Sequence, residues 1–340
     1  MSITIKEIAK IAGVSIGTVD RALHNRGRIR PELARHILQI ADEAGYTPSH
    51  AGRALALAKN PIKIGIIAHM VKTDFMIAIM RGIEAAKSEL ESLGAQIFLK
   101  SIESINIPKQ LAAIDELVAE GVQGITISPA EDPAIYQKIK EVSPNIPIIT
   151  FNTDIAGSGR TCFVGLNNRE SGKAAAHLMA TLVNGKGKVA IITGHRSNQA
   201  CNHRVESFTA KIREDYPEII LGNTEFCLDK EEIAYELTVS NITNYPDIVG
   251  IFMCAGGQAG MCKALDQLGA SSRVKVVAYD LFPATAKGLE TGAIDFLIDQ
   301  DAFLQGYRSA MLLYDKLFHN KEMRQEYFYT DIIIKTKYNV

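Results

Sequence analysis

Several features that define other classes of protein are missing from this sequence. Proline is scarce, with 11 residues in 340, and charged residues make up 22% of the chain against 47% hydrophobic ones. This composition is typical of a folded globular protein and excludes a disordered one. No run approaches the roughly 18 apolar residues that a membrane helix requires, and the first residues contain no apolar signal core. We therefore expect a cytoplasmic protein without a membrane partner.

Cysteine is also sparse, and its pattern excludes two kinds of site. The five cysteines are odd in number and widely spaced, and no Cys-x-x-Cys motif occurs. This spacing favours reduced thiols, mostly buried as small hydrophobic side chains, over a disulfide framework or a metal centre. The residues concerned are Cys162, Cys201, Cys227, Cys254 and Cys262.

The motifs of common enzyme classes are absent as well. No Gly-x-Gly-x-x-Gly follows a predicted strand, and neither a phosphate-binding Gly-x4-Gly-Lys-[Ser/Thr] nor a zinc-binding His-Glu-x-x-His occurs. The glycine clusters 157–159 and 185–187 fall in predicted loops with the wrong continuation. Cys201-Asn202-His203 has no orienting carboxylate nearby. We therefore expect no catalytic residue, cofactor or metal, and an enzyme remains the rival class.

The distribution of charge points to two dissimilar parts. The net charge of −1 argues by itself against a nucleic-acid partner, but residues 1–60 carry nine Lys and Arg against five Asp and Glu. A basic head on an acidic body is expected when one domain alone contacts phosphate. A chain of 340 residues also exceeds the usual size of one compact core, so two or three domains are expected.

The first 48 residues predict an all-α helix-turn-helix domain. Thr4 and Glu7 have the spacing of a capping box that opens a helix. Gly13 supplies the positive-φ residue of a tight turn, and Ser15 can cap a second helix over 16–23. Pro31 begins a third helix that runs to Ala44. Two helices joined by a glycine-containing turn are typical of DNA-binding heads.

These residues resemble the head of a LacI/GalR-family repressor. The resemblance covers nearly all of residues 3–60, through 4–9, 12–15, Thr18-Val19, Arg21 and the phrase Gly45-Tyr46-Thr47-Pro48. It implies that the second helix enters the major groove of a pseudo-palindromic, double-stranded DNA operator. It assigns phosphate or base contacts to Thr4, Ser15, Ile16, Gly17, Thr18, Arg21, His24 and Arg28.

Two residues depart from the family pattern. Gly17 stands where a larger side chain is usual, and Asp20 stands where a serine is usual. Glycine has no side chain with which to read a base, and phosphate repels a carboxylate unless the carboxylate pairs with Arg21 or accepts from cytosine. The alternative is a three-helix bundle that contacts protein.

A short alanine-rich segment, 49–61, follows the head. Alone it is too short for a stable helix in water. The resemblance implies that it folds on DNA, with Gly52 allowing close approach of the backbone and Leu55 wedging into a central minor-groove step. A plain linker ending at Asn60-Pro61 is the alternative reading.

From Ile62 the pattern changes to short apolar runs that alternate with amphipathic helices, which predicts a parallel α/β fold. The expected strands are 62–68, 96–100, 123–127, 146–151, 187–192, 219–226, 248–253 and 274–279. The expected helices include 75–93, 108–120, 168–184, 230–244 and 301–319. Two strands run into a polar residue, Asn152 and Asp280. Because ligands of open α/β sheets bind beyond the carboxyl ends of strands, two facing sheets would place these residues on opposite walls of one cleft.

This body resembles a type I periplasmic-binding-protein-like effector domain, built from two Rossmann-like parallel-sheet subdomains. The resemblance spans about 62–335 and includes the phrase 81–86. It implies a domain over 62–340, with a first subdomain of about 62–158 plus 292–322 and a second of about 162–290 plus 325–340. The chain then crosses between them near 155–163, near 290 and near 320–328.

The closest branch of that family binds pentoses and hexoses. Carried over by position, the effector-binding residues are Phe75, Met76, Asn152, Thr153, Arg204, Asp280 and Gln300. An aromatic ring covers the C–H face of a sugar, while carboxylate, amide and guanidinium groups bond its hydroxyls.

Two departures leave the effector class open. Asn152-Thr153 replaces an Asp-Arg pair, and 254–257 replaces Asn-Asp. The resemblance implies a homodimeric transcriptional repressor with a sugar or sugar acid as effector. A non-sugar polar metabolite, or no effector, is the alternative, and the DNA-binding head excludes a secreted solute-binding protein.

Overall fold

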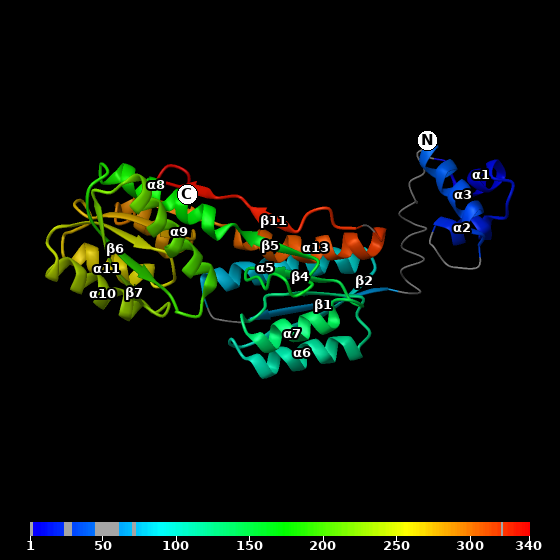
Figure 1. The fold of residues 1–340 in the computed structure, drawn as a ribbon, viewed down its shortest axis with the longest axis horizontal. Helices are drawn as coiled ribbons and strands as arrows, with labels where there is room; N and C mark the ends of the chain where they lie inside the picture. The colour runs from blue at the N-terminus through cyan, green and yellow to red at the C-terminus, as the bar shows by residue number, and fades with distance from the viewer. Residues whose placement is uncertain (1–2, 24–28, 45–60, 70–72, 321) are drawn as a thin grey trace. The chain divides into compact units, whose positions relative to one another are not determined.

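The computed structural model describes residues 3–23, 29–44, 61–69, 73–320 and 322–340. The chain divides into two compact units, Met1–Pro61 and Ile62–Val340 (Figure 1). In the described ranges, no helix is long and apolar enough to span a membrane.

The first unit contains the three expected helices, α1 (Ile5–Ile11), α2 (Ile16–Leu23) and α3 (Pro31–Glu43). The capping box is confirmed: the Thr4 amide donates to Glu7 Oε2 at 2.8 Å, and the Glu7 amide donates to Thr4 Oγ1 at 3.3 Å. Gly13 has φ +65° in the turn. The Thr18 amide donates to Ser15 Oγ at 3.2 Å, so Ser15 caps α2 as predicted. The helices pack on a small core of Ile8, Ala9, Val19, Ala22, Ile37 and Ala41.

The second unit contains two six-stranded sheets, one in each lobe. The first sheet is parallel throughout and has the order β11-β5-β4-β3-β1-β2. Its strands are β1 (Ile62–His69), β2 (Ala95–Ile102), β3 (Gly124–Ile127), β4 (Ile148–Phe151), β5 (Cys162–Leu166) and β11 (Tyr327–Thr330). Helices α6 (Ile107–Ala119) and α7 (Pro133–Val142) cover one face, and α5 (Asp74–Ser92) and α13 (Ala302–His319) cover the other (Figure 1).

The second sheet has the order β12-β10-β9-β8-β6-β7, and β12 alone is antiparallel to its neighbour. Its strands are β6 (Gly187–Thr193), β7 (Ile219–Phe226), β8 (Ile248–Met253), β9 (Lys275–Tyr279), β10 (Phe296–Asp299) and β12 (Ile333–Lys335). Its helices are α8 (Asn168–Leu182), α9 (Gln199–Asp215), α10 (Glu231–Asn244), α11 (Gln258–Gln267) and α12 (Pro283–Thr291). The doubly wound α/β prediction is confirmed for both lobes. All five cysteines are free thiols, and four of them are buried.

The crossings between the lobes differ from the sequence-based boundaries. The chain leaves the first sheet after β5, whose Cys162 pairs with Ile149 of β4, so residues 162–166 belong to the first lobe. It leaves the second sheet only after β10, because Leu297 and Ile298 are fully buried beside β9. The short strands β5 and β10 extend their sheets by pairing with neighbours, a tertiary effect that their brief apolar runs do not indicate.

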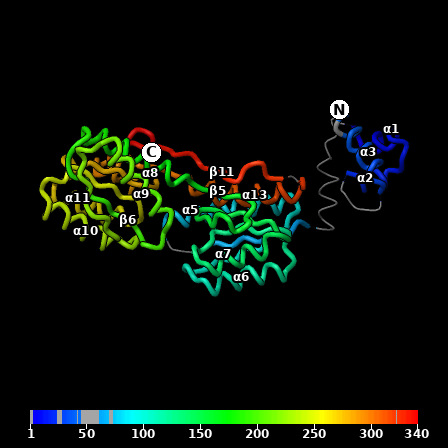
Figure 2. Tube along the Cα trace, viewed as in Figure 1, coloured from blue at the N-terminus to red at the C-terminus, as the bar shows by residue number. Residues whose placement is uncertain are grey.

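The last crossing also falls later than expected. Residues 327–330 form β11 and pair with β5 in the first sheet, whereas 333–335 form β12 and pair with β10 in the second. The three crossings therefore lie at 167, 300–301 and 331–332, and the Cα trace can be followed through them in Figure 2.

Helices α5 and α13 pack closely because glycines face each other at their contact. A methyl group at Gly82 would lie 2.0 Å from the carbonyl oxygen of Phe303, and one at Gly306 would lie 2.3 Å from the carbonyl oxygen of Ile79. Backbone atoms cannot withdraw without moving a helix. This contact fixes α13 against the first lobe.

Gly82→Ala is expected to lower the free energy of unfolding by about 1–3 kcal/mol, because the added methyl group overpacks the helix pair. Urea unfolding of the full chain measures the change. Gly222→Ala is the control, since its nearest heavy atom outside the adjoining residues lies at 3.5 Å, and it should change the free energy by less than about 0.5 kcal/mol. Equal effects of the two substitutions would contradict the close helix contact.

Candidate functional site

Polar groups of the first lobe gather where β3 and β4 end. Asn152 follows β4 directly and has φ +63°, a conformation that asparagine tolerates better than most residues. Its Nδ2 lies 3.4 Å from Ser128 Oγ and 3.9 Å from Met76 Sδ. Thr153 Oγ1 donates to the carbonyl oxygen of Pro129 at 2.7 Å. The structure thus brings three predicted residues together and adds Ser128.

Phe75 lies beside Met76 in the first turn of α5, and its side chain is half-buried. Among the described residues it makes no hydrogen bond or ring pair. Its assignment to the effector site stays a prediction.

The second lobe carries a chain of three polar side chains. Arg204 Nη2 donates to Gln300 Oε1 at 2.9 Å, and Gln300 Nε2 donates to Asp280 Oδ1 at 2.7 Å. Arg204 comes from α9, Asp280 follows β9, and Gln300 follows β10. Since these three elements are distant in sequence, the hydrogen bonds show that the predicted second-lobe residues form one cluster.

Arg204 is 5% exposed, so protein groups in place of water must stabilise its positive charge. Its Nε donates to Asn168 Oδ1 at 2.7 Å, its Nη1 lies 3.4 Å from the carbonyl oxygen of Cys254, and its guanidinium lies 4.2 Å from the ring centre of Tyr279. Sequence reasoning missed Asn168. Asn167 and Asn168 directly follow β5, as Asn152 follows β4, but the sequence did not predict β5, so the rule about strand ends could not be applied to them.

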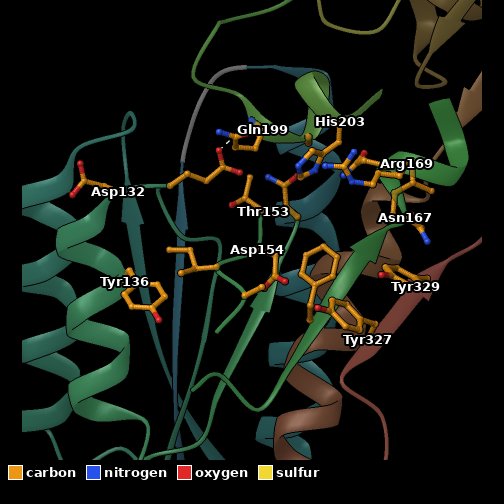
Figure 3. A pocket seen from close by; sticks show the side chains of 18 of the residues that line it. Asp132, Tyr136, Thr153, Asp154, Asn167, Arg169, Gln199, His203, Tyr327 and Tyr329 are labelled. Atoms are coloured by element: carbon orange, nitrogen blue, oxygen red, sulfur yellow. Dashed lines mark hydrogen bonds between the residues drawn. The ribbon is translucent and has the colours of Figure 1, made fainter. Parts of the chain in front are cut away.

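A cavity of about 660 Å³ lies between the lobes (Figure 3). Asn152 and Thr153 line it, but Arg204, Asp280 and Gln300 do not. The amide of Gln199 at the start of α9 donates to Glu131 Oε2 at 3.1 Å, a direct hydrogen bond between the lobes. Burial raises the pKa of Glu131. The remaining lining residues, which sequence reasoning missed, include Tyr136, Phe163, Asn167, His203, Tyr327 and Tyr329.

The predicted DNA-contact residues form an exposed face on α2. Ser15, Ile16, Gly17 and Arg21 are exposed, with Ile16 at 53%, although isoleucine is usually buried. Ser15 Oγ and Thr18 Oγ1 are 2.8 Å apart, and Arg21 Nε donates to the carbonyl oxygen of Gly17 at 2.9 Å.

The other DNA-contact predictions fare differently. Thr4 is engaged in its capping box, where its hydroxyl donates to Glu7 Oε2. His24, Arg28, Gly52 and Leu55 lie outside the described residues. No group of His, Cys, Asp and Glu in the described part of the chain is arranged to hold a metal ion.

Burial and charge act against each other at Asp280. Desolvation raises the pKa of its carboxyl to about 6, while Arg204 and the hydrogen bond from Gln300 oppose the rise. The unfolded chain keeps the ordinary value of 3.8. Between these values the folded state binds more protons, so the free energy of unfolding falls as pH rises from about 4 to about 6.

Asp280→Asn should therefore gain stability relative to the wild type as the pH rises. Its free energy of unfolding, minus that of the wild type, is expected to increase by roughly 1–3 kcal/mol between about pH 4 and pH 7, allowing for partial exposure. Urea titrations at several pH values measure the difference. Asp266→Asn on α11 is the control, because its side chain is exposed. Parallel curves for Asp280→Asn and the wild type would show that ionisation of Asp280 carries no cost.

Comparisons with known proteins match each of the two units to a known family. Residues 4–49 match the family of bacterial regulatory proteins, lacI family, and residues 64–321 match the periplasmic binding protein domain. The probable HTH-type transcriptional repressor ExuR of Bacillus subtilis is 28% identical over 62% of this chain and 60% of its own length. The ribose operon repressor of Halalkalibacterium halodurans is 25% identical over 82% of this chain and 81% of its own length.

Solved structures match the body. A glucose-galactose binding protein from Geobacillus stearothermophilus aligns with a TM-score of 0.73 at 22% identity, over 83% of this chain and 99% of that one. A solute binding protein from Burkholderia graminis in complex with D-arabinose aligns with a TM-score of 0.73 at 25% identity, over 82% and 96% of the two chains. The chain therefore belongs to the periplasmic binding protein domain family through residues 64–321, and its helix-turn-helix head, residues 4–49, matches the lacI family of bacterial regulatory proteins.

Proposed function

We propose that the chain is a cytoplasmic, homodimeric transcriptional repressor whose affinity for a pseudo-palindromic operator changes when a sugar-like effector binds between its two lobes. The observation that carries the proposal is the hydrogen-bonded chain Arg204–Gln300–Asp280 at the carboxyl edge of the second sheet. A buried guanidinium, an amide and a carboxylate in sequence can serve the alternating donors and acceptors of a polyol. The names of the relatives support a regulator over an enzyme.

The head supplies the DNA-binding part of the proposal. Ile16 and Gly17 meet base edges, Ser15 and Thr18 meet phosphates, and Arg21 reaches a base edge or a phosphate. Ile16 lies exposed at the start of the short capped helix α2, where its side chain does not stabilise the fold of the head. Its exposure therefore supports a role in contact with DNA. His24, Arg28, Gly52, Leu55 and Thr4 complete the proposed contact set.

The two lobes supply the effector-binding part. Asn152 in the first lobe and Asp280 in the second both follow the fourth strand of a sheet, and both have positive φ, +63° and +66°. The first-lobe cluster is neutral and the second carries the charges, so the second lobe supplies most of the binding energy. An effector that contacts both lobes stabilises their closed arrangement by its differential affinity.

Arg21→Ala is expected to weaken operator binding by about 1–3 kcal/mol if Arg21 forms a bidentate contact with a base. Fluorescence anisotropy with operator fragments selected from genomic DNA measures the loss, and affinity should fall steeply with salt because phosphate contacts release counterions. Arg35→Ala removes the same charge from α3 and is the control. Selection that enriches no palindromic fragment would contradict the repressor proposal.

Arg204→Ala is expected to abolish the effector response and to leave operator affinity unchanged, because Arg204 belongs to the body and not to the head. Coupling between effector and operator of about 1–3 kcal/mol is the typical range for such linkage. The effector is first identified by a thermal-shift screen of sugars, sugar acids and nucleobases on the full chain, and the shift in operator affinity is then measured. Arg213→Ala, an exposed site on the same helix, is the control.

The effects of Arg204→Ala and Asp280→Ala then distinguish a neutral sugar from a sugar acid as the effector. A neutral sugar should depend on Asp280 at least as strongly as on Arg204, whereas a sugar acid should depend mainly on Arg204. Wild-type responses from both Arg204→Ala and Asp280→Ala would place the effector elsewhere.

A further inference from the structure

Three of the five cysteine thiols lie around one short loop of the second lobe. Cys254 follows β8 directly, Cys201 lies in the first turn of α9, and Cys227 follows β7. All three side chains are buried. The Cys201 thiol donates to the carbonyl oxygen of Cys254 at 3.3 Å, and the Cys227 thiol donates to the carbonyl oxygen of Gly256 at 3.2 Å. Elements that are distant in sequence thus bring three sulfur atoms to residues 254–256.

Cys201 and Cys254 are in direct contact with each other. Besides the bond from Cys201 to the Cys254 carbonyl, the two thiol groups are hydrogen-bond partners. Cys254 Sγ also lies 3.3 Å from Thr193 Oγ1. The Cys227 thiol is directed to a different carbonyl. Since a disulfide requires neighbouring side chains, Cys201 and Cys254 are the pair placed to form one.

The two thiols of this pair differ in acidity. A hydrogen bond from the Cys254 thiol and the nearby charge of Arg204 lower the pKa of Cys201, although burial opposes them. Burial raises the pKa of Cys254 well above its ordinary value. The position of Cys201 in the first turn of a helix also favours its thiolate. Because the thiolate is the nucleophilic form of cysteine, Cys201 is the attacking member of the pair and Cys254 is the resolving one.

A small oxidant can approach the pair from the cavity between the lobes. Gln199, Ala200 and His203 of α9 line this cavity, and Figure 3 shows Gln199 and His203 beside it. Cys201 stands between Ala200 and His203 on the same turn of the helix and is 4% exposed. Its sulfur therefore lies just behind the cavity wall. Hydrogen peroxide is little larger than water, so a local opening of this turn is enough to admit it.

The other three cysteines have the properties of unreactive thiols. Burial raises the pKa of Cys227 and Cys262 to about 11, and that of Cys162 to about 12. Cys262 is nevertheless the most exposed of the five, because the other four are buried. If exposure alone governed reactivity, Cys262 would react first. Acidity and pairing instead favour Cys201, which makes the comparison with Cys262 a sharp one.

The thiol pair shares a carbonyl group with the effector cluster. Arg204 Nη1 lies 3.4 Å from the Cys254 carbonyl oxygen, to which the Cys201 thiol also donates. Arg204 follows Cys201 by three residues on α9, so the two side chains lie on the same face of the helix. A disulfide removes the thiol donor from this carbonyl and draws the two sulfur atoms to about 2 Å. The oxidation state of the pair is thereby coupled to the hydrogen bonds of Arg204 with Gln300 and of Gln300 with Asp280.

We propose that Cys201 and Cys254 form a peroxide-sensitive thiol pair that closes to a disulfide and makes the second lobe a redox sensor. The Cys201 thiolate attacks hydrogen peroxide; an S–O bond forms, the O–O bond breaks, and the departing hydroxide takes the proton that Cys201 released. The Cys254 sulfur then attacks the Cys201 sulfenic acid; the S–S bond forms, the S–O bond breaks, and water leaves with the Cys254 proton. Two thiols lose two electrons, and one peroxide becomes two water molecules.

The test treats the fully reduced full chain with a small molar excess of hydrogen peroxide at neutral pH. Free thiols are then alkylated under denaturing conditions and counted by mass spectrometry. The count should fall from five to three, because two thiols enter one disulfide. Peptide mapping without reduction should recover Cys201 joined to Cys254, a result that requires no variant.

Three variants separate the roles of the cysteines. Cys201→Ser should keep all four of its thiols, because the nucleophile is gone. Cys254→Ser should stop at the Cys201 sulfenic acid, which dimedone traps. Cys262→Ser removes the most exposed cysteine and is the matched control; its thiol count should still fall from four to two.

A second measurement follows the coupling to Arg204. In ¹⁵N-labelled protein, the Nε–H resonance that disappears in Arg204→Lys identifies Arg204, and this resonance should shift on oxidation of the wild type but not of Cys201→Ser. The Nε–H resonance of Arg160, a buried arginine of the first lobe, is the control and should not move.

Three results would overturn the proposal: five thiols retained after peroxide treatment, a disulfide that joins any other pair of cysteines, or an Arg204 resonance that is the same in the reduced and oxidised protein. The thiol chemistry is independent of the repressor function proposed above, and only its effect on the effector response rests on that function. None of these measurements involves DNA or an effector, so their failure is distinguishable from failure of the repressor proposal.

Discussion

The hydrogen-bonding requirement of one buried cation organises the carboxyl edge of the second lobe. Removing a guanidinium from water costs several kcal/mol unless its N–H groups find partners. Arg204 finds them in Asn168, Gln300 and the Cys254 carbonyl, and its charge rests over the Tyr279 ring. These groups come from α8, the second crossing, the end of β8 and the end of β9. The Arg204 side chain thereby fixes the positions of these four segments relative to one another. Gln300, which accepts a hydrogen bond from Arg204, donates one to Asp280.

Long periodic segments were predictable from sequence, and the short strands next to a sheet edge were not. Helix 75–93 was expected and Asp74–Ser92 was found, because an amphipathic face over five turns leaves a clear apolar period. β5 has five residues and β10 has four, and each is specified by pairing with a neighbour that is distant in sequence. The same reason hid the exposed rings Tyr327 and Tyr329, which gain their position only when β11 joins β5.

The residues of the candidate site also divide into those that a physical rule predicts from the sequence and those that it does not. Asn152 and Asp280 follow from a physical rule about strand ends, whereas Asn168 follows β5, a strand that only the structure reveals. Arg204 lies inside a helix, and Gln300 follows β10, a strand that the sequence analysis did not predict, so no local pattern indicates that the two meet. Their assignment came from resemblance to a family. The structure then supplied the hydrogen bond that joins them.

The three crossings have a mechanical consequence. β5 and β11 are neighbours at one edge of the first sheet, and β10 and β12 are neighbours at one edge of the second. All three connections between the lobes therefore lie side by side, between the edge of the first sheet formed by β5 and β11 and the edge of the second formed by β10 and β12. This arrangement resists sliding of one lobe over the other and leaves rotation of the lobes about the three connections as the easiest relative motion. Rotation about the crossings would displace β2 and β7 most, because these strands form the sheet edges opposite the crossings.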